Sequence, residues 1–347
     1  MELSRKTTLR NLRDVDLLPL SPIERASLLF TLGVLLGTVT HIPILTHIVL
    51  VLTIYFACKD WRIAFFFCGY FVYTCYTVIP WETAVPSFIT DVSQRFVSYI
   101  DTLPYDTEYL TKAFLQGDKT DLTKDTISLF RESGVSHLLA LSGLHIGILY
   151  MIFDLFLPKK HRIIRYIIVV PAALFFTLMV GAKPSIVRAF LFILIRETSK
   201  LCNWELTLLQ VLSIALMIQL TLVPTVITSI GFQLSYCSVL GIALLYPVLD
   251  NLYEDTGLLK RVWQAMSISV SCQVFTTPLS WYYFHTFPLH FLIANLIAVP
   301  LTSIFMYLSI AVIILSACQI CPEFMYTAID FFGNNLLLES LRIISSL

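Results

Sequence analysis

Residues 133–147 read Ser-Gly-Val-Ser-His-Leu-Leu-Ala-Leu-Ser-Gly-Leu-His-Ile-Gly, a stretch that opens a long apolar run and yet carries histidines, serines and glycines. At helical spacing His137, Leu141 and His145 fall on one side of a helix, with Ser142 close by. Such residues cost free energy at membrane depth unless they meet partners or water. The stretch therefore indicates a helix inside a bundle of membrane helices or along a polar path. Tight helix packing through small residues explains it equally well.

The composition of the whole chain is that of a membrane protein. Of 347 residues, 57% are hydrophobic and 13% are charged, against about 25% charged residues in ordinary soluble domains. Basic and acidic residues number 23 each, so the net charge identifies no partner. The first 25 residues contain no apolar run, and we expect no cleavable signal peptide. The uncharged runs predict an all-α, polytopic helix bundle of about 9–11 spans with broken helices.

The positions of the spans follow from length and proline. Residues 26–58 carry no charge, but one helix of this length would measure about 50 Å, beyond a hydrocarbon core of about 30 Å. We expect a hairpin broken at His41-Ile-Pro43, followed by a span at 63–80. Further spans are expected at 134–157, 163–181, 185–200, 205–223 and 229–248, and two or three pieces in the charge-free region 262–322, broken around Pro278, Pro288 and Pro300.

The remaining segments are polar. Residues 82–133 hold nine acidic and five basic residues, look partly helical with a helix start near 121–125, and are too few for a robust independent core. Their net acidity argues against a nucleic-acid clamp. The expected division is a cytoplasmic tail at 1–25, transmembrane helices at 26–81, an acidic extracytoplasmic segment at 82–133, a channel domain at 134–322 and an amphipathic interfacial helix at 323–347.

The distribution of Lys and Arg predicts the orientation. With the N-terminus in the cytoplasm, the basic loops at 59–62, 159–165, 196–200 and 260–261 all face the cytoplasm, and the short outer loops near 41–43, 224–228 and 282–290 carry no Lys or Arg. This is the positive-inside pattern. The expected location is the bacterial plasma (inner) membrane, with several passes.

Polar residues inside the apolar segments are the candidate functional residues. Pro184 suits the first turn of a helix, and Arg188 then lies one turn into it, where a charge usually faces the protein interior or water. Snorkelling to the headgroups is the alternative. We expect a shared translocation path lined by Ser136, His137, Ser142, Gly143, His145, Gly147, Ser185, Arg188, Gln233, Ser235, Gln273 and Asn295. Hydrogen bonding between helices without any path is the alternative for each of these residues.

Several chemistries are not expected. There is no His-Glu-x-x-His motif and no phosphate-binding loop, and His137 and His145 would lie about 12 Å apart along a helix, too far to share a metal. Ser142 and His145 could imitate a nucleophile and base, but no acidic residue is placed to orient them. The lone Cys318-Gln-Ile-Cys321 pair lacks a redox context. We expect no enzymatic activity, no catalytic residue, no metal and no cofactor.

Four segments together, in this order, resemble the competence domain of the ComEC family, the bacterial inner-membrane DNA-uptake channel. They are Phe130 to Gly147, Gly181 to Ala189, Ile230 to Gly241 and Gln273 to Pro300. The resemblance covers roughly residues 110–315 and implies passage of single-stranded DNA across the plasma membrane during natural transformation. The family's oligonucleotide-binding-fold insert and C-terminal metallo-β-lactamase-like domain are not recognised in this sequence.

The resemblance implies single-stranded DNA as the translocated substrate, the lipid bilayer as surroundings, and a separate nuclease, DNA receptor or ATPase, or further copies of the chain, as partners. Few intramembrane cations are available to a polyanion, and sparse cations suit a conduit, which must not bind tightly. They suit equally a transporter of a small anionic or lipid-linked solute. A membrane scaffold without a substrate is the third alternative.

Overall fold

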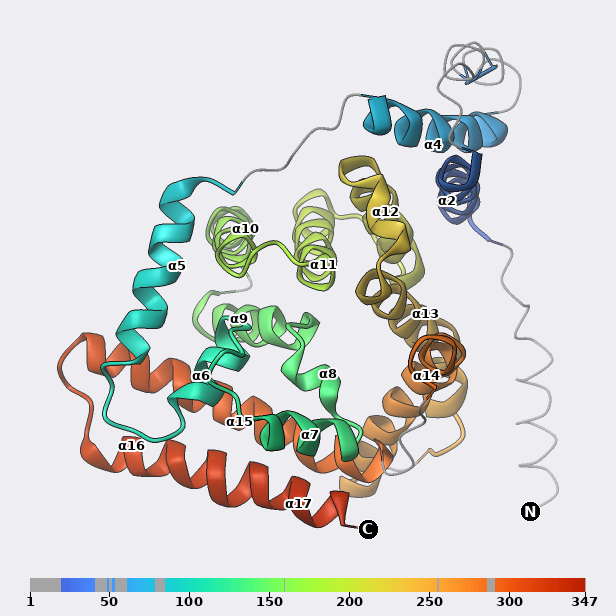
Figure 1. Cartoon of the computed structure of the whole chain (residues 1–347). Coiled ribbons are helices and arrows are strands. Elements are labelled where there is room, and N and C mark those ends of the chain that lie inside the picture. The colour runs from blue at the N-terminus through green and yellow to red at the C-terminus, as the bar shows by residue number, and fades with distance from the viewer. Residues whose placement is uncertain are drawn as a thin grey trace, which may run out of the picture. The chain divides into compact units, whose positions relative to one another are not determined.

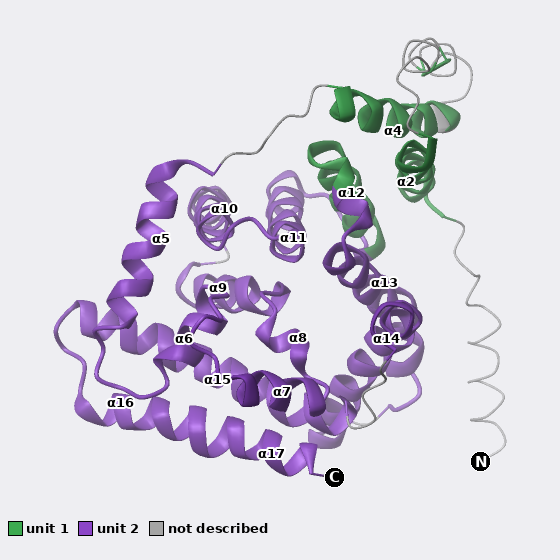
Figure 2. Cartoon of the chain, viewed as in Figure 1, with its two compact units in different colours: residues 1–81, 209–225 green, residues 82–208, 226–347 purple. Residues whose placement is uncertain are grey.

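The computed structural model describes residues 20–40, 49, 52–53, 61–78, 85–158, 160–254, 256–285 and 291–346. Within these ranges the chain is helical and contains no strand, so the all-α prediction is confirmed (Figure 1). The chain forms two compact units, residues 1–81 with 209–225 and residues 82–208 with 226–347 (Figure 2).

The helices are α2 Pro22–Thr40, α4 Trp61–Val78, α5 Ser87–Ile100, α6 Glu108–Leu115, α7 Lys124–Glu132, α8 Ser136–Leu139, α9 Gly143–Phe156, α10 Arg162–Met179, α11 Pro184–Cys202, α12 Leu208–Leu222, a 3₁₀ turn η1 Pro224–Thr228, α13 Ile230–Asp250, α14 Leu258–Phe284, α15 Phe291–Ala317, α16 Glu323–Asp330, a π-helical turn η2 Phe331–Leu338 and α17 Glu339–Ser345. Most of the expected spans therefore appear as helices within a few residues. The piece expected at 43–58 lies almost entirely outside the described residues.

In the first unit, α2 and α4 cross where each has a glycine. A Cβ added at Gly33 would strike the carbonyl of Phe66, and one added at Gly69 would strike the carbonyl of Phe30. The two backbones therefore approach more closely than any side chain would allow, as in membrane helix pairs that associate through small residues.

Four helices of the described residues are long and apolar enough to cross a membrane, namely α2, α10, α13 and α15. Shorter apolar helices lie at 63–78, 143–156 and 208–222. Helix α11, expected as a span, carries Arg188, Arg196, Glu197 and Lys200 and is not among the four. The chain is thus a membrane protein in which one long central helix is unusually rich in charge.

Two expected helix breaks are wrong. Helix α14 runs through Pro278 and α15 runs through Pro300 without interruption, whereas Pro288 lies outside the described residues. A proline removes one backbone donor, but membrane helices tolerate it.

A break lies instead inside the stretch at 133–147. The expected single helix, with His137, Leu141 and His145 on one side, is wrong, because α8 ends at Leu139 and Ala140 is extended at ψ 127°. Ser142 then caps α9, accepting from the N–H of Leu144, and the His145 ring accepts from the N–H of Ser142. This capping box starts a new helix at Gly143.

The acidic segment forms α5, α6 and α7, and it shares a core with the C-terminal helices. Phe114 of α6 is fully buried, with ring centroids 6.1 Å from Phe130 and 5.8 Å from Phe305 of α15. The expected helix start near 121–125 is confirmed, because Thr123 caps α7. The segment is thus a layer of the second unit, as its small size requires.

Polar contacts fasten this layer at two points. The carboxylate of Asp330 accepts from the N–H and the hydroxyl of Thr107, both at 2.9 Å. The Lys112 ammonium pairs with Asp101 and Asp121. Burial opposes the charge of Lys112, but these hydrogen bonds outweigh it and raise the pKa of Lys112.

The amphipathic helix expected at 323–347 packs on protein along its buried side, with Ile329, Leu337 and Leu341 fully buried.

Candidate functional site

Arg188 lies where three helices of the second unit meet. It is the fifth residue of α11, and its side chain is 8% exposed. One terminal nitrogen, Nη1, donates to the carbonyl of Ser235 on α13. The other, Nη2, lies 3.6 Å from the place that a Cβ at Gly143 of α9 would occupy. The structure therefore brings three of the predicted residues together.

The turn before α11 sets this position. Gly181 ends α10 with φ 83°, and Ala182 follows at φ 48°, a left-handed conformation that is uncommon for a residue with a side chain. Pro184 then occupies the first turn of α11, where a missing N–H costs nothing. The sequence from Gly181 to Pro184 thus reverses the chain and points Arg188 one turn into the unit.

Arg188 has no carboxylate partner among the described residues. Its guanidinium carbon lies 5.9 Å from the ring centroids of both Phe192 and Tyr236, and its Nε has no hydrogen-bond partner. An isolated buried charge is costly, and aromatic faces offset only part of that cost. The site therefore holds an uncompensated cation with a free donor.

His145 is the second buried donor. The N–H of Ser142 donates to its Nδ1 at 3.1 Å, so the neutral ring carries its proton on Nε2. This Nε2 has no partner, and the residue is 2% exposed. The Ser142 hydroxyl lies 3.3 Å from Nδ1, but it also caps α9. No carboxylate of the described residues orients the ring, so the pair lacks the third member that a hydrolase requires.

The predicted glutamines find partners within the protein. Gln233 donates to the carbonyl of Ile227 at 2.9 Å and accepts from the hydroxyl of Tyr283 at 3.0 Å. Gln273 donates to the hydroxyl of Thr277 at 3.3 Å on its own helix. The contact of Gln233 with Tyr283 joins α13 to α14, as the alternative of hydrogen bonding between helices expects, whereas the contact of Gln273 stays within α14.

The other predicted residues differ in their surroundings. Ser185 donates to the carbonyl of Gly231 at 3.4 Å, which ties α11 to α13 beside Arg188. The Oδ1 atom of Asn295 on α15 is buried without a partner. No contact given by the structure ties Ser136, His137 or Gly147 to Arg188. Ser136 and His137 are exposed, and a Cβ at Gly147 would meet nothing within 4 Å.

The helices that carry these residues form a closed ring of contacts. Within the second unit, α9 contacts α11, α11 contacts α13, α13 contacts α14, α14 contacts α15, and α15 returns to α9. Figure 1 shows α15 lengthwise, whereas α10 and α11 are seen nearly along their axes, so the apolar helices do not all run parallel. The predicted path residues lie on this ring or on α8, which is joined to it. Whether they line one cavity stays a prediction.

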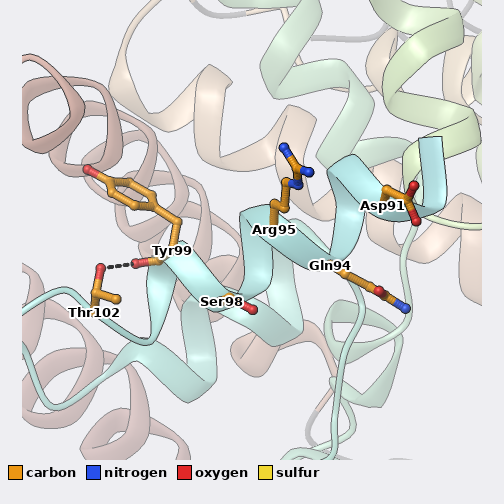
Figure 3. A pocket seen from close by; sticks show the side chains of 6 residues that line it. All are labelled: Asp91, Gln94, Arg95, Ser98, Tyr99 and Thr102. Atoms are coloured by element: carbon orange, nitrogen blue, oxygen red, sulfur yellow. Dashed lines mark hydrogen bonds between the residues drawn. The ribbon is translucent and has the colours of Figure 1, made fainter. Parts of the chain in front are cut away.

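The pocket drawn in Figure 3 lies elsewhere. One polar face of α5 lines it, with Asp91, Gln94, Arg95, Ser98 and Tyr99. Thr102, in the turn that follows α5, completes the lining. Another shallow pocket lies at the start of α14, around Lys260, Arg261 and Gln264. Neither contains a predicted path residue.

A buried charge network was not predicted from the sequence. Arg165 of α10, 3% exposed, pairs with Asp154 at 2.6 Å and with Glu197 at 3.1 Å. Glu197, 2% exposed, also pairs with Lys200 and accepts from the hydroxyl of Tyr150 at 2.7 Å. Its partners come from three helices, and Arg165 had been assigned to a cytoplasmic loop. The one local signal was Glu197, the one acidic residue of α11.

Comparison with known proteins gives two matches. The profile of a family described as "Competence protein" matches residues 114–347. The "ComE operon protein 3" of Bacillus subtilis (strain 168) is 24% identical over 218 residues, which cover 61% of this chain and 27% of that relative. The matched region thus spans about a quarter of the relative's length. No solved structure matches.

Proposed function

Because this chain belongs to the competence protein family, we propose that it forms part of a transmembrane channel for uptake of single-stranded DNA across the bacterial plasma membrane. The observation that carries the proposal is Arg188, a buried cation that no carboxylate of the described residues neutralises. A phosphodiester is a single negative charge with two free oxygens. The guanidinium is a planar fork that binds such a group through two hydrogen bonds.

The surroundings of Arg188 suit brief contact with a moving strand more than permanent binding of one. The Ser235 carbonyl and two aromatic faces hold the guanidinium in place, and none of them competes as an anion. Gly143 leaves the space beside Nη2 without a side chain. A strand contacting one fixed cation would be bound weakly enough to move on, which conduction requires.

The test is a transformation assay in a deletion strain that carries variants at normal membrane levels. Arg188→Ala should reduce uptake of DNA by roughly 10- to 150-fold, the loss of one charge-assisted hydrogen bond of about 1.5–3 kcal/mol. Arg188→Lys should restore part of it, because a point charge replaces a fork. Arg196→Ala, an exposed arginine of the same helix, is the matched control. Wild-type uptake with Arg188→Ala would overturn the role of Arg188.

Gly143→Leu tests the space beside Arg188. Its side chain would extend beyond a Cβ that already lies 3.6 Å from both Nη2 of Arg188 and Cβ of Ala189. Uptake should fall although the charge remains. Gly257→Leu is the control, because Gly257 is not a predicted path residue and a Cβ there meets nothing within 4 Å.

The proposal includes several passes through the membrane with the N-terminus in the cytoplasm, as the basic loops indicate. The turn at 181–183 and the acidic segment then face the same side, and Gln116 donates to the carbonyl of Met179 at 3.4 Å across them. Cysteine substituted at Lys160 should resist membrane-impermeant labels in intact cells. Labelling from outside would reverse the orientation.

We further propose that the chain transports without catalysing. The Ser142–His145 pair serves as a helix cap, and the residues described hold no cluster of three metal-ligating side chains. A separate nuclease, a DNA receptor, an ATPase or further copies of the chain would act with it. Degradation of DNA by the purified chain in buffer with divalent cations, after exclusion of contaminants, would refute this.

A further inference from the structure

Three segments meet outside the Arg188 site. Gly117, just after α6, adopts φ 69°, and a Cβ added there would contact Lys183 Nζ at 3.0 Å and strike the side chain of Leu141. Leu141 belongs to the break between α8 and α9, and Lys183 is the residue before α11. The loop after α6, the α8–α9 break and the α10–α11 turn therefore share one small region, and Lys183 is in the middle of it.

This region carries two free lysines. Lys119 and Lys183 are both exposed, and they act on each other electrostatically, as like charges that repel. No ion pair joins either to an acidic side chain of the described residues. Asp118 directly precedes Lys119, and its carboxylate accepts from the N–H and the hydroxyl of Thr120 at 3.0 and 2.8 Å. Lys183 acts electrostatically on this carboxylate, but no ion pair joins the two groups. The region thus holds two exposed cations and one carboxylate.

His145 lies within electrostatic range of Lys183. The Nε2–H of its ring is buried without an acceptor. A buried donor without an acceptor is rare in folded proteins and calls for a missing partner. An ammonium and an unpaired N–H beside it require the same partner, an oxygen that carries negative charge.

We infer that Lys119 and Lys183 form an outer phosphate subsite, which binds the sugar-phosphate backbone of a strand before it reaches Arg188. The inference rests on the proposed function and adds to it. Lys183, the residue before α11, precedes Arg188 by five residues, so their backbones are separated by about 7.5 Å at the helical rise per residue. That distance is similar to the separation of neighbouring phosphates in an extended strand. One strand therefore contacts both cations through successive or nearly successive phosphates.

The two subsites have different physical characters. The outer lysines are solvated point charges on flexible stems, which attract a polyanion from a distance and release it easily. Arg188 is buried and held in place by Ser235. The outer subsite concentrates the strand at the mouth of the ring, and the inner one orients a single phosphate within it.

The test uses the full chain in nanodiscs of zwitterionic lipid and a fluorescein-labelled dodecathymidylate, with the dissociation constant measured over a range of salt concentrations. Lys119→Gln and Lys183→Gln should each weaken binding several-fold at low salt. Each should also reduce the slope of log affinity against log salt by about 0.7, the value for one phosphate contact with a single strand. Lys124→Gln, an exposed lysine at the start of α7, is the matched control and should leave the slope unchanged.

Inorganic pyrophosphate supplies a second readout. It should displace the oligonucleotide from the wild type at lower concentration than from the Lys119→Gln, Lys183→Gln double variant. If the wild type binds the oligonucleotide and the lysine variants keep the control's affinity and slope, the outer subsite is overturned and the proposed function stands. If the wild type binds no oligonucleotide, both the proposed function and the outer subsite fail.

Discussion

Two buried arginines on neighbouring helices have opposite surroundings. Arg165 of α10 reaches two carboxylates and the hydroxyl of Tyr150, whereas Arg188 of α11 reaches one carbonyl and two aromatic rings. Both are at most 8% exposed. Burial alone therefore does not distinguish a structural cation from a functional one, and the distinction lies in the counter-charge. Arg165 is neutralised within the chain, whereas Arg188 has no carboxylate partner among the described residues.

Two lysines of the second unit, Lys112 and Lys183, show the same contrast between a paired and an unpaired cation. Lys112 is buried and pairs with Asp101 and Asp121, whereas Lys183 has no ion pair among the described residues. The paired cations fasten segments to each other. The unpaired cations, Lys183 in the α10–α11 turn and Arg188 on α11, are the ones that we propose to contact a strand.

The largest effect on stability is expected for Glu197→Ala. The substitution leaves Arg165 and Lys200 with one fewer buried counter-charge, and breaking a buried pair typically costs about 3–5 kcal/mol. Denaturant unfolding of the detergent-solubilised protein would measure it. Glu205→Ala, an exposed glutamate near the end of α11, is the control. An unfolding midpoint equal to that of the control would show that the network does not hold the unit together.

A smaller effect is expected for Arg165→Lys. The ammonium keeps the charge, but it cannot reproduce the fork that reaches Glu197 from Nε and both Asp154 and the Tyr150 hydroxyl from Nη2. We expect a loss of about 1–3 kcal/mol, the value of a hydrogen bond to a charged group. Arg196→Lys on the exposed side of α11 should change the same unfolding curve very little.

Tyr150→Phe should cost less still. The hydroxyl donates to Glu197 and accepts from Arg165 and Lys200, all within 2.8 Å. Its loss leaves the ions paired with one another, so we expect about 1 kcal/mol, the usual net value of one hydrogen bond. Tyr166→Phe on α10 is the matched control. A loss as large as that of Glu197→Ala would mean that the hydroxyl, rather than the ion pairs, organises the network.

The sequence predicted one of these arginines and missed the other for a physical reason. Arg188 follows Pro184 by one turn inside an apolar run, so its burial is visible from neighbouring residues alone. Arg165 stands in a basic loop sequence, and its partners lie 11 residues before it and 32 after it. Only the packing of α9, α10 and α11 brings them together, and no local pattern reports that packing.

Helix positions were predictable in the same uneven way. Hydropathy placed α10 to α13 within a few residues, because apolar length is a local property. The breaks were not placed correctly, because α14 continues through Pro278, whereas Ser142 starts a new helix through a capping box. That box uses His145 in the position where Glu or Gln is usual. The sequence pattern therefore did not predict the capping box at Ser142.

The smallest effect on stability, and the sharpest test of the comparison, is expected for Arg188→Met. Replacing a buried ion by an apolar side chain of similar length is often neutral or stabilising, because its desolvation cost disappears. The carbonyl of Ser235 is not left without a partner, because the hydroxyl of Ser238 donates to it at 2.9 Å. We therefore expect unfolding within about 1 kcal/mol of the wild type, together with loss of DNA uptake.

The matched variant is Arg165→Met, which leaves Asp154 and Glu197 without their arginine and should destabilise the unit by about 3 kcal/mol or more. A stable but inactive Arg188→Met beside an unstable Arg165→Met would establish that the two buried charges serve different ends. If Arg188→Met unfolded as readily as Arg165→Met, the carbonyl and the aromatic rings would be full partners of the guanidinium. Arg188 would then be a structural residue, and the argument that it awaits a phosphate would fail.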